Sequence, residues 1–187
     1  LGGSNMELTN SEADRLNSAP FNRILQPIVL NYNQGRPLST PKPAERILII
    51  TADMFQANLS NFVALKESQG FSTSVVSLTT VGGNTTTAIK NYIKTEYLGP
   101  NPPDYVILVG DYYPGNAADL TNWDFRTDTG VRTDLHYFTM DSETEFVPDI
   151  LGGRFPVRTV AQLTAMVNKY LAYQDASGVE PWIKKAE

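Results

Sequence analysis

The sequence predicts an α/β fold built on a parallel, doubly wound sheet with helices on both faces. Two continuous apolar runs, residues 46–52 and 105–111, are typical of strands that are buried on both sides. An alternating run at residues 71–78 predicts a third strand, and segments with helical spacing separate the three. Each crossover is long enough for a right-handed βαβ unit, and the runs are too few to close a barrel.

Length and composition limit the classes of function. The 187 residues are enough for one domain with a hydrophobic core, and the net charge of -5 argues against nucleic acid as a partner. The sequence contains no cysteine, which excludes disulfides, thiolate metal sites and a cysteine nucleophile within these residues. A single histidine, His136, excludes a histidine metal cluster, and no apolar stretch approaches the ~20 residues of a membrane helix.

Residues 1–45 are predicted to form an irregular leader or linker. They are polar and carry Pro37, Pro41 and Pro43, which argue against a central strand or a long helix. The chain starts at Leu1 without an initiator methionine, so we expect a processed or excised piece of a longer protein. The α/β domain is predicted to occupy residues 46–187.

Two helices are predicted between the first three strands. Apolar residues recur at helical spacing from Phe55 to Leu65, and Gly70 is expected to end this helix in the left-handed conformation. Thr85 or Thr86 can cap the second helix. Its predicted buried side chains are Ala88, Ile89, Tyr92, Ile93 and Tyr97.

The second half of the chain is less regular. Residues 112–133 have no clear periodicity, and a loop of this length is usually functional or mobile. Residues 134–139 and 149–155 predict two further short strands. In the second of these, the pair Gly152-Gly153 indicates the close approach of another backbone.

The last predicted helix begins at a capping box formed by Thr159 and Gln162. Its predicted buried stripe consists of Leu163, Met166, Val167, Tyr170 and Leu171. Beyond it, residues 176–187 lead to a point where another strand could begin.

Asp111 directly follows the apolar strand at residues 105–109. A carboxylate cannot stay inside such a strand, so Asp111 is expected at the carboxyl edge of the sheet, where open α/β sheets bind ligands. A turn residue at the start of the next loop is the alternative, and Asp111 by itself favours that alternative.

The residues richest in potential chemistry lie between positions 141 and 149. They are the carboxylates of Asp141, Glu143, Glu145 and Asp149, with the carbonyl of Val147 between them. Alternate residues of an extended chain point the same way, so these oxygens could converge on Ca²⁺, which takes 6–8 oxygen ligands, with Asp111 as a further ligand. A solvated acidic loop is the other interpretation, and spacing alone favours it.

His136 is expected to be a packing residue on the predicted strand at 134–139. A catalytic histidine needs a nucleophile or an acid within reach. The sequence has no cysteine, and none of its serines lies in a Gly-x-Ser-x-Gly turn.

Taken in order, the segments of this chain resemble the gingipain-like cysteine peptidases, peptidase family C25. The resemblance includes Val109-Gly110-Asp111 and Gly153-Arg154-Phe155, and it covers residues 46–182. The matching segments are residues 47–52, 66–71, 89–93, 105–111, 134–137, 148–150, 153–157 and 163–173.

The resemblance implies the first half of a caspase-like catalytic domain. In this family the catalytic histidine and cysteine lie in the following subdomain, so no catalytic residue is expected in this chain, and the chain alone should be inactive. The implied partners are the C-terminal catalytic half of the same protein and the polypeptide substrate of the intact enzyme. The implied localisation is secreted or at the surface of a bacterial cell.

The resemblance also implies a structural calcium ion in this first subdomain. The family's ligands match Asp111 and Asp149, with Glu145 as the intervening acid and Val147 as the carbonyl donor. The first acid of the loop matches Asp141 or Glu143, because this sequence carries two extra residues there. The resemblance therefore favours calcium over a solvated loop.

Two alternatives to an endopeptidase are a sortase of a type IX secretion system, from the same family, and a non-enzymatic flavodoxin-like binding module. The binding module would fold alone and bind a small ligand at the sheet edge. The peptidase interpretation predicts an exposed apolar face on this chain, where the catalytic half docks.

Overall fold

The computed structural model describes residue 28 and residues 44–124, 132–142 and 146–175. The chain divides into two units, Leu1–Glu45 and Arg46–Glu187. The predicted leader lies almost entirely outside the described residues, so the fold below is that of the second unit. Among the described residues, no helix is both long enough and apolar enough to cross a membrane.

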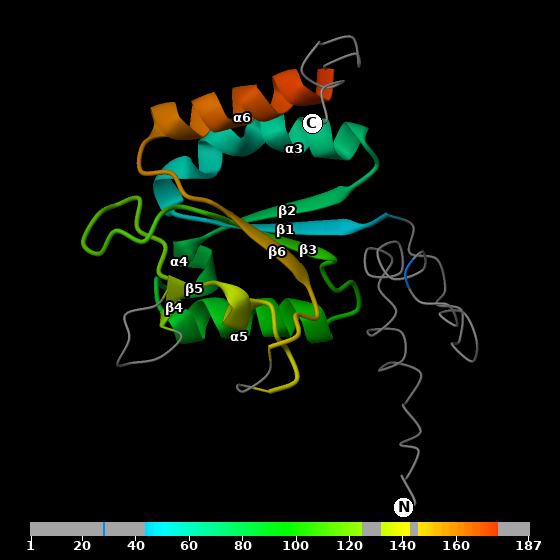
Figure 1. Cartoon of the computed structure of the whole chain (residues 1–187), viewed down its shortest axis with the longest axis vertical. Helices are drawn as coiled ribbons and strands as arrows, with labels where there is room; N and C mark the ends of the chain where they lie inside the picture. Colours follow the sequence, from blue (N-terminus) through cyan, green and yellow to red (C-terminus); the bar gives the residue numbers. More distant parts are fainter. Residues whose placement is uncertain (1–27, 29–43, 125–131, 143–145, 176–187) are drawn as a thin grey trace, which may run out of the picture. The chain divides into compact units, whose positions relative to one another are not determined.

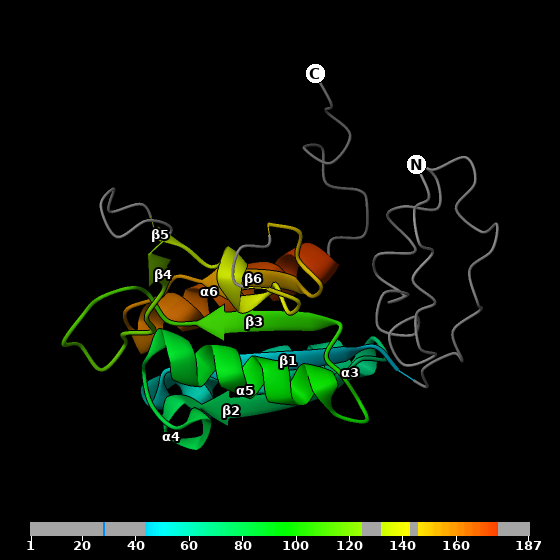
Figure 2. The same ribbon diagram turned by 90° about the horizontal axis from the view of Figure 1, so that it is seen from below.

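Four parallel strands form the central sheet (Figures 1 and 2). They are β1 (Arg46–Thr51), β2 (Ser72–Ser77), β3 (Tyr105–Val109) and β6 (Leu151–Phe155), in the order β2-β1-β3-β6. The prediction of a parallel sheet with helices on both faces is therefore confirmed, and β6 is an edge strand within the described part of the chain.

Helices cover the two faces of this sheet (Figure 1). One face carries η1 (Asp53–Leu59), α3 (Ser60–Ser68) and α6 (Val160–Asp175). The other face carries α4 (Leu78–Val81), α5 (Thr86–Leu98) and η2 (Leu135–Tyr137). Each long helix returns the chain from the carboxyl ends of the strands to their amino ends, as a βαβ crossover requires.

The predicted helix boundaries depend on local capping, which the structure confirms. Gly70 has a φ of 91°, and its N–H donates to the carbonyl of Glu67 at 2.9 Å. The hydroxyl of Thr85 accepts from the N–H of Ala88 at 3.1 Å, which caps α5. At the start of α6, the hydroxyl of Thr159 accepts the N–H of the residue three positions later at 3.2 Å.

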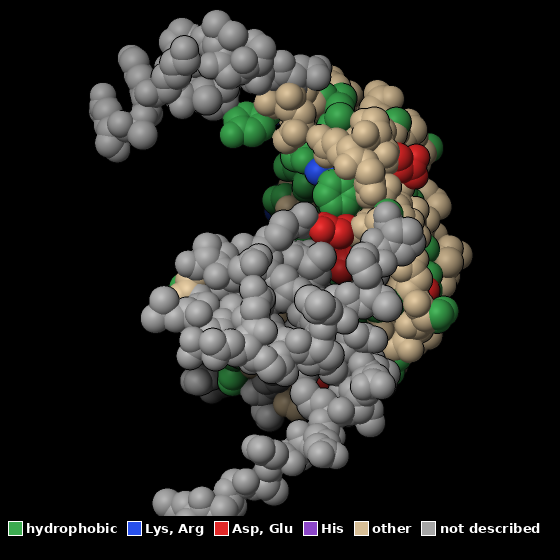
Figure 3. All heavy atoms as spheres, turned by 90° about the vertical axis from the view of Figure 1, so that its right-hand side faces the viewer, with side chains coloured by type: hydrophobic (Ala, Val, Ile, Leu, Met, Phe, Trp, Pro, Cys, Tyr) green, Lys and Arg blue, Asp and Glu red, His purple; other side chains and the backbone are tan. Residues whose placement is uncertain are grey.

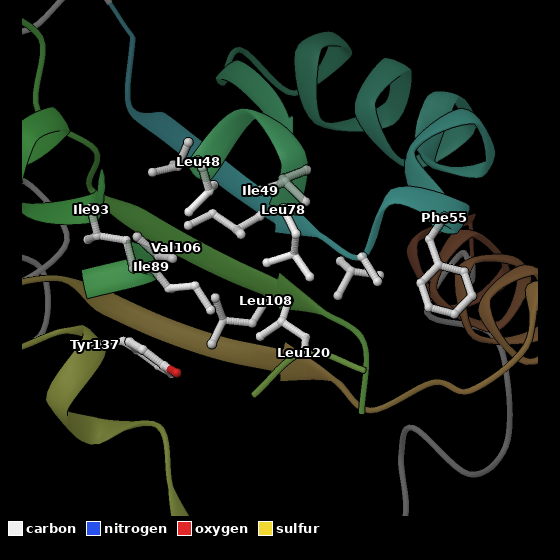
Figure 4. Packing of buried hydrophobic residues seen from close by; sticks show 14 of the residues in the cluster. Leu48, Ile49, Phe55, Leu78, Ile89, Ile93, Val106, Leu108, Leu120 and Tyr137 are labelled. Atoms are coloured by element: carbon white, nitrogen blue, oxygen red, sulfur yellow. The ribbon is translucent and has the colours of Figure 1, made fainter. Parts of the chain in front are cut away.

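The hydrophobic core occupies both faces of the sheet, and one part of it lies between the strands and α5. Leu48, Val106 and Leu108 point from the strands toward Ile89 and Ile93 of the helix (Figure 4). All five side chains are fully buried. The predicted buried stripe of α5 is confirmed at its centre, and burial of this kind is the main favourable term in folding.

The predicted strand at residues 134–139 is wrong, because the 3₁₀ helix η2 occupies the middle of this stretch, Leu135–Tyr137. The ammonium group of Lys90 donates to the backbone carbonyls of both His136 and Thr139. Carbonyl groups three residues apart point to opposite sides in a strand but to the same side in a helical turn. A lysine from α5 therefore selects the turn over the strand.

Two other segments also differ from the predictions. The strand predicted at residues 71–78 ends at Ser77, because the hydroxyl of Ser77 accepts the N–H of Thr80 at 3.3 Å and starts α4. The region expected to be structureless contains a short antiparallel pair, β4 (Trp123–Asp124) and β5 (Arg132–Thr133).

The adjacent glycines of β6 have different surroundings. A Cβ atom on Gly152 would lie 2.2–2.4 Å from the ring of Phe138, whereas a Cβ on Gly153 would meet nothing within 4 Å. The predicted close approach thus exists at Gly152, but it is made by an aromatic side chain rather than by backbone. Since Phe138 is 6% exposed, its ring has little room to move.

We expect Gly152→Ala to lower the free energy of unfolding by about 1–3 kcal/mol, because the new methyl group overpacks against Phe138. Gly153→Ala is the matched control and should raise that free energy by up to about 1 kcal/mol, since it reduces the freedom of the unfolded chain without a clash. Urea unfolding of both variants measures the difference. Equal effects of the two substitutions would contradict this packing.

Candidate functional site

The carboxyl ends of the strands are the natural place for a functional site in an open parallel sheet. Here the chain leaves β3 through Gly110, which has a φ of 142°. A Cβ on Gly110 would lie 2.8 Å from the Cβ of Leu120 and 2.9 Å from the carbonyl oxygen of Ala118. The loop after β3 therefore folds back tightly over the strand end, and the N–H of Leu120 donates to the carbonyl of Asp111 at 2.9 Å.

Side-chain hydrogen bonds hold this loop from within and from outside. The Asp119 carboxylate accepts from the N–H of Tyr113 and from the side-chain amide of Asn84, each at 2.8 Å. The carbonyl oxygen of the Asn84 side chain accepts from the N–H of Thr121, also at 2.8 Å. Asn84 precedes α5 in the sequence, so it ties the start of that helix to the loop.

Arg154 of β6 connects the largest number of segments at this edge. Its Nη1 donates to the carbonyls of Gly110 and Leu120, at 2.9 and 2.8 Å. Its Nη2 also reaches the carbonyl of Thr121 at 3.3 Å. Its Nε and Nη2 form a two-pronged ion pair with Asp134, at 2.8 and 2.7 Å. Such a fork of donors suits a guanidinium and not an ammonium group.

A second ion pair at this edge is more exposed. The Nε of Arg158 lies 2.5 Å from Oδ2 of Asp111, and its guanidinium lies 4.7 Å from the ring centre of Tyr113. The Arg158 side chain is 53% exposed, against 12% for Arg154. Asp111 thus stands at the sheet edge, as predicted, but a neighbouring cation already balances its charge.

His136 packs among aromatic side chains in this region. It is 8% exposed, and its ring centre lies 5.5 Å from that of Trp123. Burial lowers the pKa of His136, and the charge of Lys90 lowers it further. The histidine is therefore neutral at pH 7, which agrees with the expected packing role although it lies on η2 and not on a strand.

Two of the predicted calcium ligands, Asp111 and Asp149, lie at opposite ends of the sheet. In the pairing of β3 with β6, Tyr105 lies opposite Leu151 and Val109 lies opposite Phe155. Asp149 precedes β6 and so lies near the amino ends, whereas Asp111 follows β3 at the carboxyl ends, which separates the two by roughly 20 Å of strand. The structure does not bring Asp111 together with the acidic loop.

Within the acidic loop, the described residues are only partly organised. Asp149 Oδ2 accepts from the N–H of Met140 at 2.5 Å, Asp141 is exposed, and Val147 is 70% exposed. Glu143 and Glu145 lie outside the described residues. Residues 44–124, 132–142 and 146–175 contain no group of three acidic, histidine or cysteine side chains able to hold a metal ion.

Sequence reasoning missed the two side chains that organise this edge. The sequence prediction places Arg154 only within a strand, although an arginine inside a short strand between Gly153 and Phe155 signals a buried ion pair. Asn84 follows a glycine pair and precedes the threonine that caps α5, which is a typical position for an amide that bonds to backbone. Together these residues can stiffen the edge, and they include no nucleophile.

Comparison with known proteins identifies a family and several relatives that match this chain. The sequence model of a family described as peptidase family C25 matches residues 40–186 of this chain. Gingipain R1 of Porphyromonas gingivalis is 25% identical over 174 residues, and gingipain R2 of the same organism is 25% identical over 172 residues. These matches cover 90% and 89% of this chain, but the chain spans only 16% and 22% of the length of those relatives.

Solved structures share the fold. One described as a protease has a TM-score of 0.63 with 24% identity, and the match covers 75% of this chain and 30% of that protein chain. The Arg-specific cysteine proteinase gingipain R has a TM-score of 0.58 with 22% identity, over 73% of this chain and 30% of its own. Dimeric latent PorU from Porphyromonas gingivalis has a TM-score of 0.55 with 21% identity, over 78% and 17%.

We expect Arg154→Met to lower the free energy of unfolding by about 3–5 kcal/mol, because it removes the charged partner of Asp134 and one donor from each of three backbone carbonyls. Arg158→Met is the matched control. It removes an exposed pair and should cost no more than about 1 kcal/mol. Urea denaturation followed by circular dichroism gives both values. A loss for Arg158→Met as large as for Arg154→Met would overturn the ranking of the two pairs.

Proposed function

Because the chain belongs to peptidase family C25, we propose that it is the N-terminal subdomain of a gingipain-like cysteine endopeptidase and braces the catalytic half of that enzyme. One observation carries the proposal. About nine tenths of the chain aligns with gingipains, yet it spans at most 22% of their length and contains no cysteine. A family that cleaves peptides by thiolate attack must therefore draw its nucleophile from another part of the protein.

The edge strand β6 supports a bracing role. β6 pairs with β3 on one side, and its other side carries no strand within the described residues. An unpaired strand edge is a template for another strand, so the sheet can continue into the catalytic half from this side. The network around Arg154 ties β6 to the loop after β3, which would hold that junction rigid.

We further propose that the parent protein is exported from a bacterial cell. Support comes from the two gingipain relatives, both bacterial. The sortase and the flavodoxin-like module remain the alternatives to an endopeptidase. The likeness to latent PorU, at 21% identity, supports a shared fold and does not favour the sortase by itself.

We expect this chain alone to cleave no peptide, and a protein that joins it to the segment encoded after it to be an active, thiol-dependent peptidase. Fluorogenic peptide hydrolysis with and without iodoacetamide measures this. The control is the downstream segment alone, which should lose most of its activity without its brace. Full activity of that segment alone would contradict the bracing role, and peptide transfer to an added amine would identify a sortase.

We also propose a structural Ca²⁺ in the acidic loop at residues 141–149. The donor chemistry fits, because carboxylates and a carbonyl are the oxygen ligands that Ca²⁺ takes. Asp149, Asp141 and the carbonyl of Val147 would hold the ion together with Glu143 and Glu145. Asp111 is left out, since it lies at the other end of β3 in an ion pair with an arginine. The bound ion would offset the repulsion among the carboxylates.

We expect Ca²⁺ to raise the melting temperature of the chain by about 5–10 °C at a hundredfold excess over Kd. Asp149→Asn should abolish this gain, because the amide still accepts the N–H of Met140 but no longer supplies charge. Asp111→Asn is the control and should change the melting temperature equally in Ca²⁺ and in chelator. Differential scanning fluorimetry decides between them. A gain that only Asp111→Asn removes would contradict the loop site.

A further inference from the structure

A groove of about 360 Å³ opens on the sheet face that carries α3 and α6. It is lined by Ile47, Lys66, Phe71, Tyr105, Val106, Ile107, Leu151, Gly152 and Gly153. The lining strand residues lie toward the amino ends of β1, β3 and β6, away from the network around Arg154. Figure 3 shows this end of the molecule, where hydrophobic side chains gather beside a basic and an acidic one.

The groove exists because one strand residue on this face of the sheet, Gly153, has no side chain. Ile107 lies opposite Gly153 in the pairing of β3 with β6, so the two residues share one face of the sheet. Gly153 contributes no side chain there, and an added Cβ would meet nothing within 4 Å. The missing side chain leaves apolar space above the strand, flanked by Leu151 and Ile107.

One wall of the groove carries the ammonium group of Lys66. The ammonium of Lys66 donates to the hydroxyl of Tyr170 at 2.5 Å and to the side-chain oxygen of Gln69 at 3.2 Å. It lies 4.8 Å from the ring centre of Tyr170 and 5.1 Å from that of Phe71. In the part of the chain that the structure describes, Lys66 pairs with no carboxylate. An ammonium has three donors, so one is left for a further acceptor.

We propose that this groove binds an apolar monocarboxylate, with the carboxylate at the Lys66 ammonium and the hydrocarbon body over Gly153. A charge-assisted hydrogen bond would use the remaining donor of the lysine. A neutral ligand would desolvate the ammonium without a compensating charge, and a cation would be repelled. The volume lies within the ~300–1,000 Å³ of small-molecule sites. The inference does not rest on the peptidase proposal, although the groove shares strand β6 with the junction proposed there.

The test is a calorimetric titration of the chain with octanoate, 1-octanol and octyltrimethylammonium, which share one hydrocarbon tail. Octanoate should bind, and the other two should bind about tenfold more weakly or not at all. Lys66→Met removes the charge and Gly153→Leu fills the floor, and each should weaken octanoate binding about tenfold or more. Lys94→Met on α5, which covers the opposite face, is the control and should leave binding unchanged.

Thermal unfolding of each variant shows that a loss of binding is not a loss of fold. Equal affinity for octanoate and 1-octanol would overturn the role of Lys66. Unchanged binding in Gly153→Leu would overturn the location. If octanoate binds only after residues 176–187 are removed, the occupant is this chain's own segment, and the small-ligand proposal is wrong.

Discussion

The structure depends most on the need to satisfy the guanidinium group of Arg154. A charge that is largely withdrawn from water is tolerated only when every donor finds a partner. Here the partners are Asp134 and the carbonyls of Gly110, Leu120 and Thr121. Each belongs to a segment with little secondary structure of its own, so one side chain on the edge strand determines where the loops at the carboxyl ends of the sheet lie.

The two ends of the sheet have different physical characters as a result. At the carboxyl ends, ion pairs and side-chain amides hold irregular backbone, and the cost of moving any one of them is the loss of several hydrogen bonds. At the amino ends, Arg46 forms an ion pair with Glu96 at 2.6 Å, and the apolar side chains of the groove surround a glycine gap and the ammonium group of Lys66. The network around Arg154 therefore fixes the loops at the carboxyl ends, whereas an open apolar groove lies toward the amino ends.

Sequence patterns were sufficient to predict an element where the residues that determine it lie close together in the chain. The strands β1 and β3, the left-handed Gly70 and the threonine cap of α5 follow from residues within a few positions of each other. The failures have distant causes. Lys90, more than forty residues away, turns the predicted strand near His136 into η2. The register of β6 against β3 separates Asp111 from Asp149, and no spacing along the chain encodes that register.

The register of β6 against β3 also limits which parts of this chain could support a catalytic half that carries the nucleophile. Preorganisation requires that supporting groups do not move when the partner arrives, because any ordering on docking is subtracted from the binding free energy. A loop tied by Asp119, Asn84 and Arg154 has lost that freedom already during folding. Asp149, which lies before β6 at the amino ends, cannot provide this support directly, since it lies a full strand length away. If calcium binds there, its effect on the carboxyl edge must pass through the stability of β6, the strand that carries Arg154.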